Sequence, residues 1–392
     1  MAEFLPYLPS KFRRIHIELT NRCNFSCTFC PMGKMTRRKE FIDPGLACSA
    51  IDQIAELALT EKITFHVMGE PLLHPAFFSI LSHAKQRKVP VGLTTNGALL
   101  TKRTIQRLVE NNLHQIDISL QTPDRESFFL TRNTHIDFDA YCGKILDLLE
   151  ACAKNSVQTI FKLRIMTTRF AKRLRKKLAI PNFMGSSDAL HRTVLQWTDL
   201  IYQRLGKEPL PRSLLLRKIR RIGIYGWNVI EVAPKIFLET YVLTDWGNAF
   251  ADCQIIEANH GYCFGMRDHF AILCSGDVVL CCIDYDGRTA LGNLKDSSLR
   301  RILESPELVR IMEGFKRNAL VHPHCRRCLG SCSRLTAVMK PLISVVGLKL
   351  LKPFLYRKYQ LFDDEVGTIS RVGSQKAHKF WRKESGDHSP GA

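Results

Sequence analysis

Segments with the pattern of strands and segments with the pattern of helices alternate through the first 165 residues. Residues 14–19 alternate apolar and polar side chains, and the residues after Pro44 carry apolar side chains at helical spacing behind a capping Asp43. This alternation predicts a parallel sheet with helices outside it, either open or curled into a barrel, with function at the carboxyl ends of the strands. Further strands are expected at 63–68, 89–95, 116–120, 158–165 and 228–233, and further helices at 75–87, 101–112 and 139–153.

The fourteen cysteines fall mostly in clusters. Three lie within residues 23–30, five within 253–282 and three within 325–332. A chain of 392 residues does not depend on disulfides for its stability, and its first residues do not resemble a signal peptide. We therefore expect a cytosolic protein whose clustered cysteines bind a metal or an iron–sulfur cluster. Plain buried cysteines are expected at Cys48, Cys142, Cys152 and Cys253.

The first cysteine cluster has the spacing C-x3-C-x2-C and directly follows the first predicted strand. A short loop of this kind can place Cys23, Cys27 and Cys30 on three irons of a cubane cluster. The fourth iron then stays open to a small molecule. A closed zinc site is the alternative, and its fourth ligand would be His16 or a distant cysteine.

With Phe29 before its last cysteine, this loop resembles the radical S-adenosylmethionine (SAM) superfamily. Three strand-end segments continue the resemblance over about residues 14–165. Met68-Gly69-Glu70-Pro71 is similar to the family's Gly-Gly-Glu motif, with Met68 replacing the first glycine, and Thr94-Thr95-Asn96-Gly97 is similar to its T-N-G segment. Ser119-Leu120-Gln121 is similar to the segment that faces the ribose and methionine of SAM. The resemblance implies that SAM is bound by Gly69, Glu70, Asn96, Ser119, Gln121 and Arg132, with Arg132 meeting its carboxylate, and Lys162 and Arg164 could also face the ligand.

The resemblance implies a partial (β/α)6-type parallel barrel with a small cysteine-rich C-terminal extension. It also implies a [4Fe–4S] cluster on the first three cysteines and an electron donor such as flavodoxin or ferredoxin. Reductive cleavage of SAM would give a 5′-deoxyadenosyl radical that removes hydrogen from a substrate carbon. The substrate radical would then be oxidised through an auxiliary cluster or quenched by a thiol, for which Cys253 and Cys332 are candidates.

The second cysteine region resembles the SPASM and twitch extensions of the same superfamily. Cys263 and Cys281 fit their C-x9–15-G-x4-C pattern around Gly276, in a predicted hairpin. The run C-x2-C-x3-C from Cys325 is too short for two auxiliary clusters. The resemblance therefore implies one auxiliary [4Fe–4S] cluster, with Cys282 or Cys332 able to replace a ligand, and a zinc ribbon is the alternative. Its expected ligands are Cys263, Cys281, Cys325 and Cys328.

The expected domains are a radical SAM core at 14–250, with a basic helical insertion at about 168–222, an auxiliary domain at 251–335, and a basic amphipathic helix with a disordered tail at 336–392. The insertion holds 14 Lys and Arg against 3 Asp and Glu, and the whole chain has a formal charge of +20. This charge favours an anionic partner, such as a sugar-, nucleotide- or phosphate-linked small molecule.

Three alternatives to a small-molecule enzyme stay open. RNA is a possible substrate although no RNA-binding motif is present, a peptide is another, and a non-enzymatic metal-binding scaffold is the third. Residues 342–356 can lie along the inner face of a membrane as an amphipathic helix, or pack on the core. Trp246 and Asn248 are expected to line the pocket, although Trp246 is equally suited to the core.

Overall fold

The structure is a computed structural model that describes residues 6–351 and 356–360, apart from residues 156, 169–171, 183, 209–210 and 224–226. The first five strands form a parallel sheet, in which each strand pairs with the next one along the chain. The predicted parallel sheet is therefore confirmed. These strands are β1 (Arg14–Ile17), β2 (Ile63–Phe65), β3 (Val91–Thr95), β4 (Gln115–Gln121) and β5 (Ile160–Thr167).

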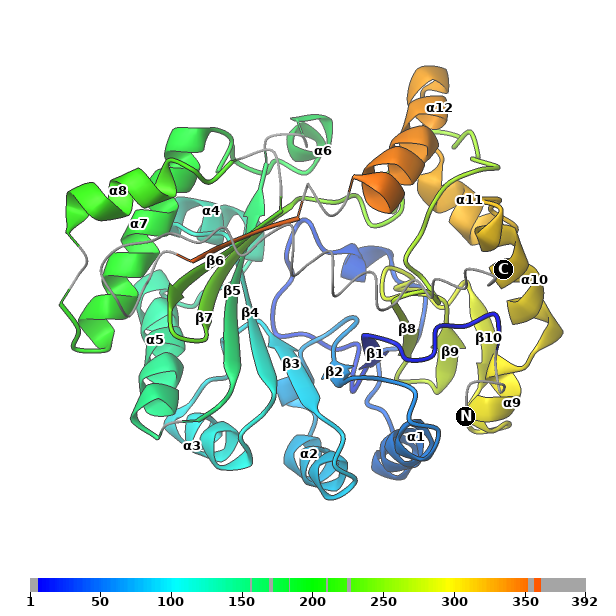
Figure 1. Cartoon of the computed structure of the whole chain (residues 1–392), viewed down its shortest axis with the longest axis horizontal. Coiled ribbons are helices and arrows are strands. Elements are labelled where there is room, and N and C mark those ends of the chain that lie inside the picture. The colour runs from blue at the N-terminus through cyan, green and yellow to red at the C-terminus, as the bar shows by residue number, and fades with distance from the viewer. Residues whose placement is uncertain are drawn as a thin grey trace, which may run out of the picture.

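Helices connect these strands and cover the outer side of the sheet (Figure 1). Asp43 caps the first of them, because its carboxylate accepts a hydrogen bond from the Leu46 N–H at 2.9 Å. Ile51 and Ile54 are fully buried in one apolar cluster with strand residues, which stabilises the layer of helices on the sheet. These helices are α1 (Pro44–Glu56), α2 (Phe77–Gln86), α3 (Lys102–Asn111), α4 (Arg125–Arg132) and α5 (Phe138–Lys154).

Three helices follow β5 within residues 168–222: α6 (Lys172–Lys177), α7 (Ser187–Arg204) and α8 (Arg212–Ile219). The strand expected at 228–233 is present as β6 (Trp227–Ala233). It turns at Lys235, with φ 62°, into β7 (Ile236–Val242), which pairs in parallel with β5. The sequence did not predict β7, although β7 and not β6 continues the barrel.

The C-terminal extension shares the sheet of the core, because β8 (His269–Ile272) pairs in parallel with β1. β9 (Asp277–Val279) and β10 (Ala290–Asn293) continue the sheet beyond it, so the predicted hairpin around Gly276 is confirmed. The strand order is β10-β9-β8-β1-β2-β3-β4-β5-β7-β6-β11, with β11 (Tyr356–Gln360) at the other edge. Since the edge strands do not pair in the described part of the chain, the sheet is a partial barrel.

A buried ion pair joins the cysteine loop, the core and the extension. Both terminal guanidinium nitrogens of Arg37 donate to the Glu18 carboxylate, at 2.8 and 2.9 Å. The same carboxylate accepts from the N–H groups of Met68, at 3.2 Å, and Cys274, at 3.0 Å. Glu18 is fully buried, so these four bonds compensate its desolvation and connect β1, the end of β2 and the β8–β9 turn.

The extension ends in a row of helices: α9 (Leu299–Leu303), α10 (Pro306–Lys316), α11 (Pro323–Leu329), α12 (Arg334–Ile343) and η3 (Ser344–Leu350). Across the described ranges, no helix combines the length and apolar character needed to cross a membrane. α12 and η3 nevertheless expose a series of large apolar side chains, Leu335, Val338, Leu342, Ile343 and Leu350. Residues 352–355 of the expected amphipathic segment, and the tail from residue 371, lie outside the described residues.

Candidate active site

The loop with the first three cysteines is anchored by two aromatic side chains. Phe25 and Phe29 are buried, and the Phe25 ring lies 6.2 Å from that of Phe128 on α4. The Thr28 N–H donates to the Thr131 carbonyl at 2.9 Å, which ties the loop to the same helix. This anchoring leaves Cys23, Cys27 and Cys30 half-buried at the carboxyl end of β1.

Hydrogen-bond donors point at the sulfur atoms of this loop. The Phe25 N–H lies 3.4 Å and the Asn96 side-chain amide 3.6 Å from Cys23 Sγ, and Arg132 Nη1 lies 3.5 Å from Cys27 Sγ. Burial raises the pKa of Cys23 to about 11 and that of Cys30 to about 12. These thiols therefore need a bound metal to become thiolates near neutral pH, and the N–H donors suit metal-bound sulfur.

Gly69 and Glu70 lie against the same loop at the end of β2. Gly69 has φ +72°, and a Cβ there would lie 2.3 Å from the Thr20 carbonyl oxygen, so only glycine fits. The Glu70 carboxylate accepts from the Thr95 hydroxyl at 2.8 Å and the Asn96 N–H at 2.7 Å. Burial raises the Glu70 pKa to about 7 despite these bonds. The strand-end motif that contains Glu70 and the one that contains Asn96 therefore meet.

The remaining predicted SAM contacts lie at the ends of β3 and β4 and at the end of helix α4. Asn96 donates to the Asn24 side chain at 2.8 Å, and Arg132 donates to the carbonyls of Ser119 and Leu120. Burial raises the pKa of Tyr241 of β7, and Gln121, with φ 54°, is close enough to lower the pKa of that phenol. The structure thus gathers all six residues around the cysteine loop, while their roles toward SAM stay predictions.

The four expected auxiliary cysteines also gather, at the side of the barrel next to β8. The Gly265 N–H lies 3.4 Å from Cys263 Sγ, and a Cβ on Gly265 would lie 3.3 Å from Cys281 Cβ. Burial, followed by the neighbouring thiols of Cys263 and Cys328, raises the pKa of both Cys281 and Cys325. The four sulfur atoms are therefore close enough to interact electrostatically.

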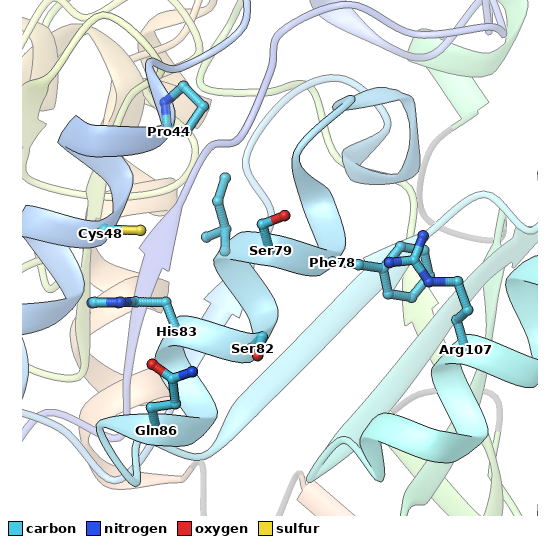
Figure 2. A pocket seen from close by; sticks show the side chains of 9 residues that line it. Pro44, Cys48, Phe78, Ser79, Ser82, His83, Gln86 and Arg107 are labelled. Carbon is cyan, nitrogen blue, oxygen red and sulfur yellow. The ribbon is translucent and has the colours of Figure 1, made fainter.

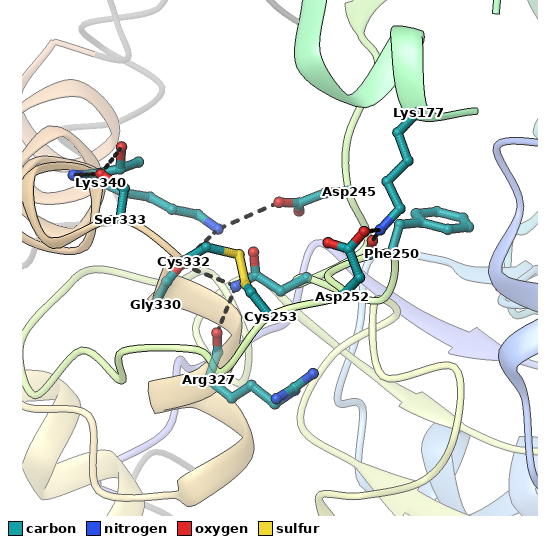
Figure 3. The surroundings of a disulfide bond; sticks show 12 residues. Lys177, Asp245, Phe250, Asp252, Cys253, Arg327, Gly330, Cys332, Ser333 and Lys340 are labelled. Atoms are coloured by element: carbon teal, nitrogen blue, oxygen red, sulfur yellow. Dashed lines mark hydrogen bonds and ion pairs between the residues drawn. A yellow bond between two sulfur atoms is a disulfide. The ribbon is translucent and has the colours of Figure 1, made fainter. Parts of the chain in front are cut away.

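Cys253 and Cys332 form a disulfide, with 5.9 Å between their Cα atoms (Figure 3). The expectation of a plain buried Cys253 is wrong, and neither residue offers the free thiol expected of a hydrogen donor or a replacement ligand. An antiparallel bridge between Ile256 and Ser331 brings the two loops together across 79 residues, a separation that no local pattern reveals. Cys142 and Cys152 are buried as expected, whereas Cys48 is half-buried.

The spacing of the sulfur atoms argues against a single zinc ion in either set. Four thiolates around one zinc lie about 3.8 Å from one another, given zinc–sulfur bonds of about 2.3 Å. Within the part of the chain that the structure describes, neither cysteine set brings three ligand atoms within 4.8 Å of one another. The wider spacing suits a cluster of several metal ions. His16, the other zinc ligand considered, belongs to a different group, with His269 and Cys282.

Polar side chains from opposite walls face one another inside the barrel. Arg164 of β5 lies 3.7 Å from the Glu239 carboxylate of β7, which Lys162 approaches to 3.3 Å. Burial, and then the charges of Arg164 and Arg14, lowers the pKa of His66 to about 3. Since three strands separate β5 from β1, these charges act across the concave side of the sheet.

Sequence reasoning proposed Lys162 and Arg164 for this interior but missed His66, Glu239 and His269, and it considered Cys282 only as a replacement ligand for the auxiliary cluster. Polar residues at alternate positions of otherwise apolar strands were the available signal. The loop after β7 closes one side of the site, because Trp246 Nε1 donates to the Phe29 carbonyl at 3.1 Å. Asn248 instead donates to the carbonyls of Arg327, at 2.7 Å, and Gly330, at 3.0 Å, so it supports the auxiliary loop.

A separate cavity of about 490 Å³ lies outside the barrel, between α1, α2 and α3 (Figure 2). Cys48, His83 and Arg107 contribute to its lining, and the Arg107 guanidinium lies over the Phe78 ring at 3.7 Å. None of the predicted site residues lines it. We assign this cavity no part in the site.

Two family models match the chain. One, described as the radical SAM superfamily, matches residues 17–168, and the other, described as an iron–sulfur cluster-binding domain and named SPASM, matches residues 263–329. The chain belongs to the radical SAM superfamily. It is an enzyme with a SPASM extension, and both resemblances drawn from its cysteines are confirmed.

Curated relatives agree with this family. A GTP 3′,8-cyclase of Synechocystis sp. is 32% identical over 260 residues, which are 57% of this chain and 73% of the relative. A SAM-dependent 2-deoxy-scyllo-inosamine dehydrogenase of Niallia circulans is 30% identical over 30% of this chain and 48% of the relative. Other relatives match over less than half of their own length. The dehydrogenase matches over 48%, and a cofactor-modifying protein of Pyrococcus furiosus, 28% identical over 27% of this chain, matches over 30%.

Two solved radical SAM structures are also similar. BtrN in complex with SAM and 2-DOIA covers 78% of this chain and 88% of its own, at 15% identity and a TM-score of 0.46. Streptococcus suis SuiB bound to SAM covers 76% of this chain and 67% of its own, at 14% identity and a TM-score of 0.49.

The two family models also identify the cofactors. As a radical SAM enzyme with a SPASM extension, the protein uses SAM, a [4Fe–4S] cluster and auxiliary iron–sulfur chemistry.

Proposed function

We propose that this radical SAM enzyme oxidises an alcohol carbon of a sugar-, nucleotide- or phosphate-linked small molecule bound inside the barrel. When bound, SAM at its cluster supplies a 5′-deoxyadenosyl radical that removes a hydrogen atom from the substrate, and an auxiliary cluster takes up the second electron. The first cluster would be held by Cys23, Cys27 and Cys30, and the auxiliary one by Cys263, Cys281, Cys325 and Cys328.

The polar interior of the barrel is the observation that carries this proposal. Arg164 and Lys162 offer positive charge to an anionic or hydroxylated substrate, and Glu239 holds them in place. His66, with its pKa lowered to about 3, is neutral, so its imidazole can accept a hydrogen bond from a substrate hydroxyl. SAM would be positioned over this interior by residues at the strand ends, Gly69, Glu70, Asn96, Ser119 and Gln121, and by Arg132 at the end of α4.

Two further observations favour oxidation of a small molecule over epimerisation. The disulfide removes Cys253 and Cys332 as the thiols expected to return a hydrogen atom. Among the relatives, one is named as a dehydrogenase of an aminocyclitol and others as cyclases of GTP. These names support a polar small-molecule substrate, while RNA and peptide substrates are the alternatives for the test below.

The partners and domains follow from the same proposal. We propose a flavodoxin or ferredoxin as electron donor, a core at 14–250 with its insertion at about 168–222, an auxiliary domain at 251–335, and a C-terminal segment at 336–392. The exposed apolar residues of α12 and η3 lie among the exposed Arg334 and Lys349, whereas Lys340 points inward and donates to the Cys328 carbonyl at 2.9 Å. This pattern supports peripheral contact with an anionic membrane surface.

Isotope transfer tests the proposed substrate class. Enzyme with reconstituted clusters, dithionite and SAM is incubated with carbon-deuterated 2-deoxy-scyllo-inosamine, GTP or UDP-glucose, or with a deuterated peptide or RNA. We expect deuterium in 5′-deoxyadenosine from one of the small molecules. Arg164→Gln should lower that transfer about tenfold or more, because a charged hydrogen bond is lost, whereas exposed Arg107→Gln should not. Transfer from peptide or RNA alone, unaffected by Arg164→Gln, would contradict the proposal.

A further inference from the structure

Three potential metal ligands meet in the barrel interior, although the SAM chemistry does not require them. His16 lies on β1, His269 on β8 and Cys282 in the turn after β9. One ligand atom of each lies within 4.8 Å of the other two, the closest such group in the described ranges. The sheet brings these distant segments together, because β1 pairs with β8 and β8 with β9.

His16 lacks a partner at the nitrogen that a ligand would use. Its side chain is buried, with the residue 4% exposed, and its Nδ1 lies 2.6 Å from the Thr64 hydroxyl. Its Nε2 is buried and has no hydrogen-bond partner among the described atoms. A buried polar atom without a hydrogen-bond partner lowers the stability of the fold by about 1–3 kcal/mol. A ligand bound to this nitrogen would remove that cost. With Thr64 accepting the Nδ1 proton, Nε2 carries the lone pair that binds metal.

His269 and Cys282 supply the other two ligands with matching geometry. His269 Nδ1 lies 3.2 Å from the Asp268 carboxylate, the outer-sphere partner common to metal-binding histidines. Its Nε2 lies 3.6 Å from Cys282 Sγ. Two ligands of a tetrahedral zinc ion, at about 2.3 Å for sulfur and 2.0–2.1 Å for nitrogen, are separated by about 3.6 Å. A hydrogen bond between thiol and imidazole gives the same distance, but it leaves His16 unexplained.

We propose that His16, His269 and Cys282 bind one zinc-class divalent ion inside the barrel. The Cys282 thiolate would supply one negative charge, and Asp268 and Glu239 supply others that offset Arg14 and Arg164 nearby. Three protein ligands leave the fourth tetrahedral position open toward the interior. A hydroxyl or carboxylate oxygen of a small molecule can bind there, which adds a Lewis-acid site to those already described. This proposal goes beyond the SAM reaction and does not depend on it.

Metal analysis of the full-length protein tests the site. Clusters are reconstituted anaerobically to a full iron content of about eight per chain, so that no empty cluster site can take up zinc. The protein is then dialysed against a small excess of zinc, desalted, and analysed for iron and zinc. We expect about one zinc per chain, loss of that zinc in Cys282→Ser and His16→Gln, and unchanged iron in both variants.

The matched control is His66→Gln, which changes a neighbouring histidine of the same interior. The His66 ring lies 5.7 Å from that of His16 but outside the ligand group, so its variant should keep the zinc. If a variant misfolds, cobalt substitution of the wild type provides a second readout, since cobalt bound to Cys282 gives a thiolate charge-transfer band. The absence of zinc and of that band from fully loaded wild type would overturn the proposal. Loss of iron from Cys282→Ser would overturn it as well, by making Cys282 an auxiliary cluster ligand.

Discussion

At the scale of single residues, Gly247 controls the space around an auxiliary cysteine. It lies between Trp246 and Asn248 in a run of three left-handed residues, with φ of 51°, 67° and 69°. A Cβ on Gly247 would lie 2.9 Å from Cys328 Sγ. Both neighbours are held, by hydrogen bonds to Phe29 and to the loop at 327–330, so the loop has little room to yield.

Gly247→Ala should therefore displace the Cys328 sulfur and release the auxiliary cluster. We expect reconstituted protein to hold about four irons in place of about eight, with the first cluster retained. Gly206→Ala is the matched control, because Gly206 also has positive φ, +63°, but faces open space. An equal loss of iron in both variants would show backbone strain alone, and full iron content in Gly247→Ala would argue against Cys328 as a ligand.

At the scale of elements, the Glu18–Arg37 pair connects the cysteine loop and the extension to the sheet. Glu18→Gln would leave the largely buried Arg37 charge without its partner and weaken the bonds to Met68 and Cys274. Breaking a buried pair from one side costs about 3–5 kcal/mol. We expect Glu18→Gln to lower the free energy of unfolding by that amount, measured by denaturant titration of the cluster-free chain.

The exposed ion pair between Glu56 and Arg87, at 3.2 Å, provides the comparison for this prediction. Solvent screens it, so Glu56→Gln should cost less than about 1 kcal/mol. Similar small effects for Glu18→Gln and Glu56→Gln would mean that the Glu18 network does not hold the extension to the core.

The α12–η3 segment carries a separate prediction. The double variant Leu342→Glu/Ile343→Glu removes exposed apolar side chains from this face and adds two negative charges to it. Leu130→Glu is the control, because it changes an exposed leucine on α4, away from this face. In flotation with vesicles containing phosphatidylserine, we expect the wild type and Leu130→Glu to rise with the vesicles and the double variant to stay behind. Equal behaviour of all three would remove the proposed membrane contact.

At the scale of the whole molecule, short sequence patterns predicted the elements that depend on residues close together in the chain. The first five strands, the helix capped by Asp43, the cysteine loop and the hairpin around Gly276 all follow from residues close in sequence. The pairing of β8 with β1, the position of β7 and the disulfide between Cys253 and Cys332 do not. These contacts join segments tens to hundreds of residues apart, and the periodicity of apolar residues within a strand or helix does not predict them.

The site divides in the same way. The strand-end motifs were predictable because each lies where a predicted strand ends, and Glu70 then brings two of them together. The interior group of His16, His269 and Cys282 was not, since it depends on which strands become neighbours. His16 appeared in the sequence only as a possible zinc ligand for the first cysteine loop, and the structure places it with another group.

The central claim is that the first three cysteines hold the cluster at which SAM is cleaved. The most direct measurement quantifies iron, sulfide and 5′-deoxyadenosine in anaerobically reconstituted protein with dithionite and SAM, for the wild type, Cys27→Ala and the control Cys48→Ala. We predict about eight irons and 5′-deoxyadenosine for the wild type and Cys48→Ala, and about four irons without 5′-deoxyadenosine for Cys27→Ala. Wild-type cleavage of SAM by Cys27→Ala, or zinc in place of iron in the wild type, would contradict the claim.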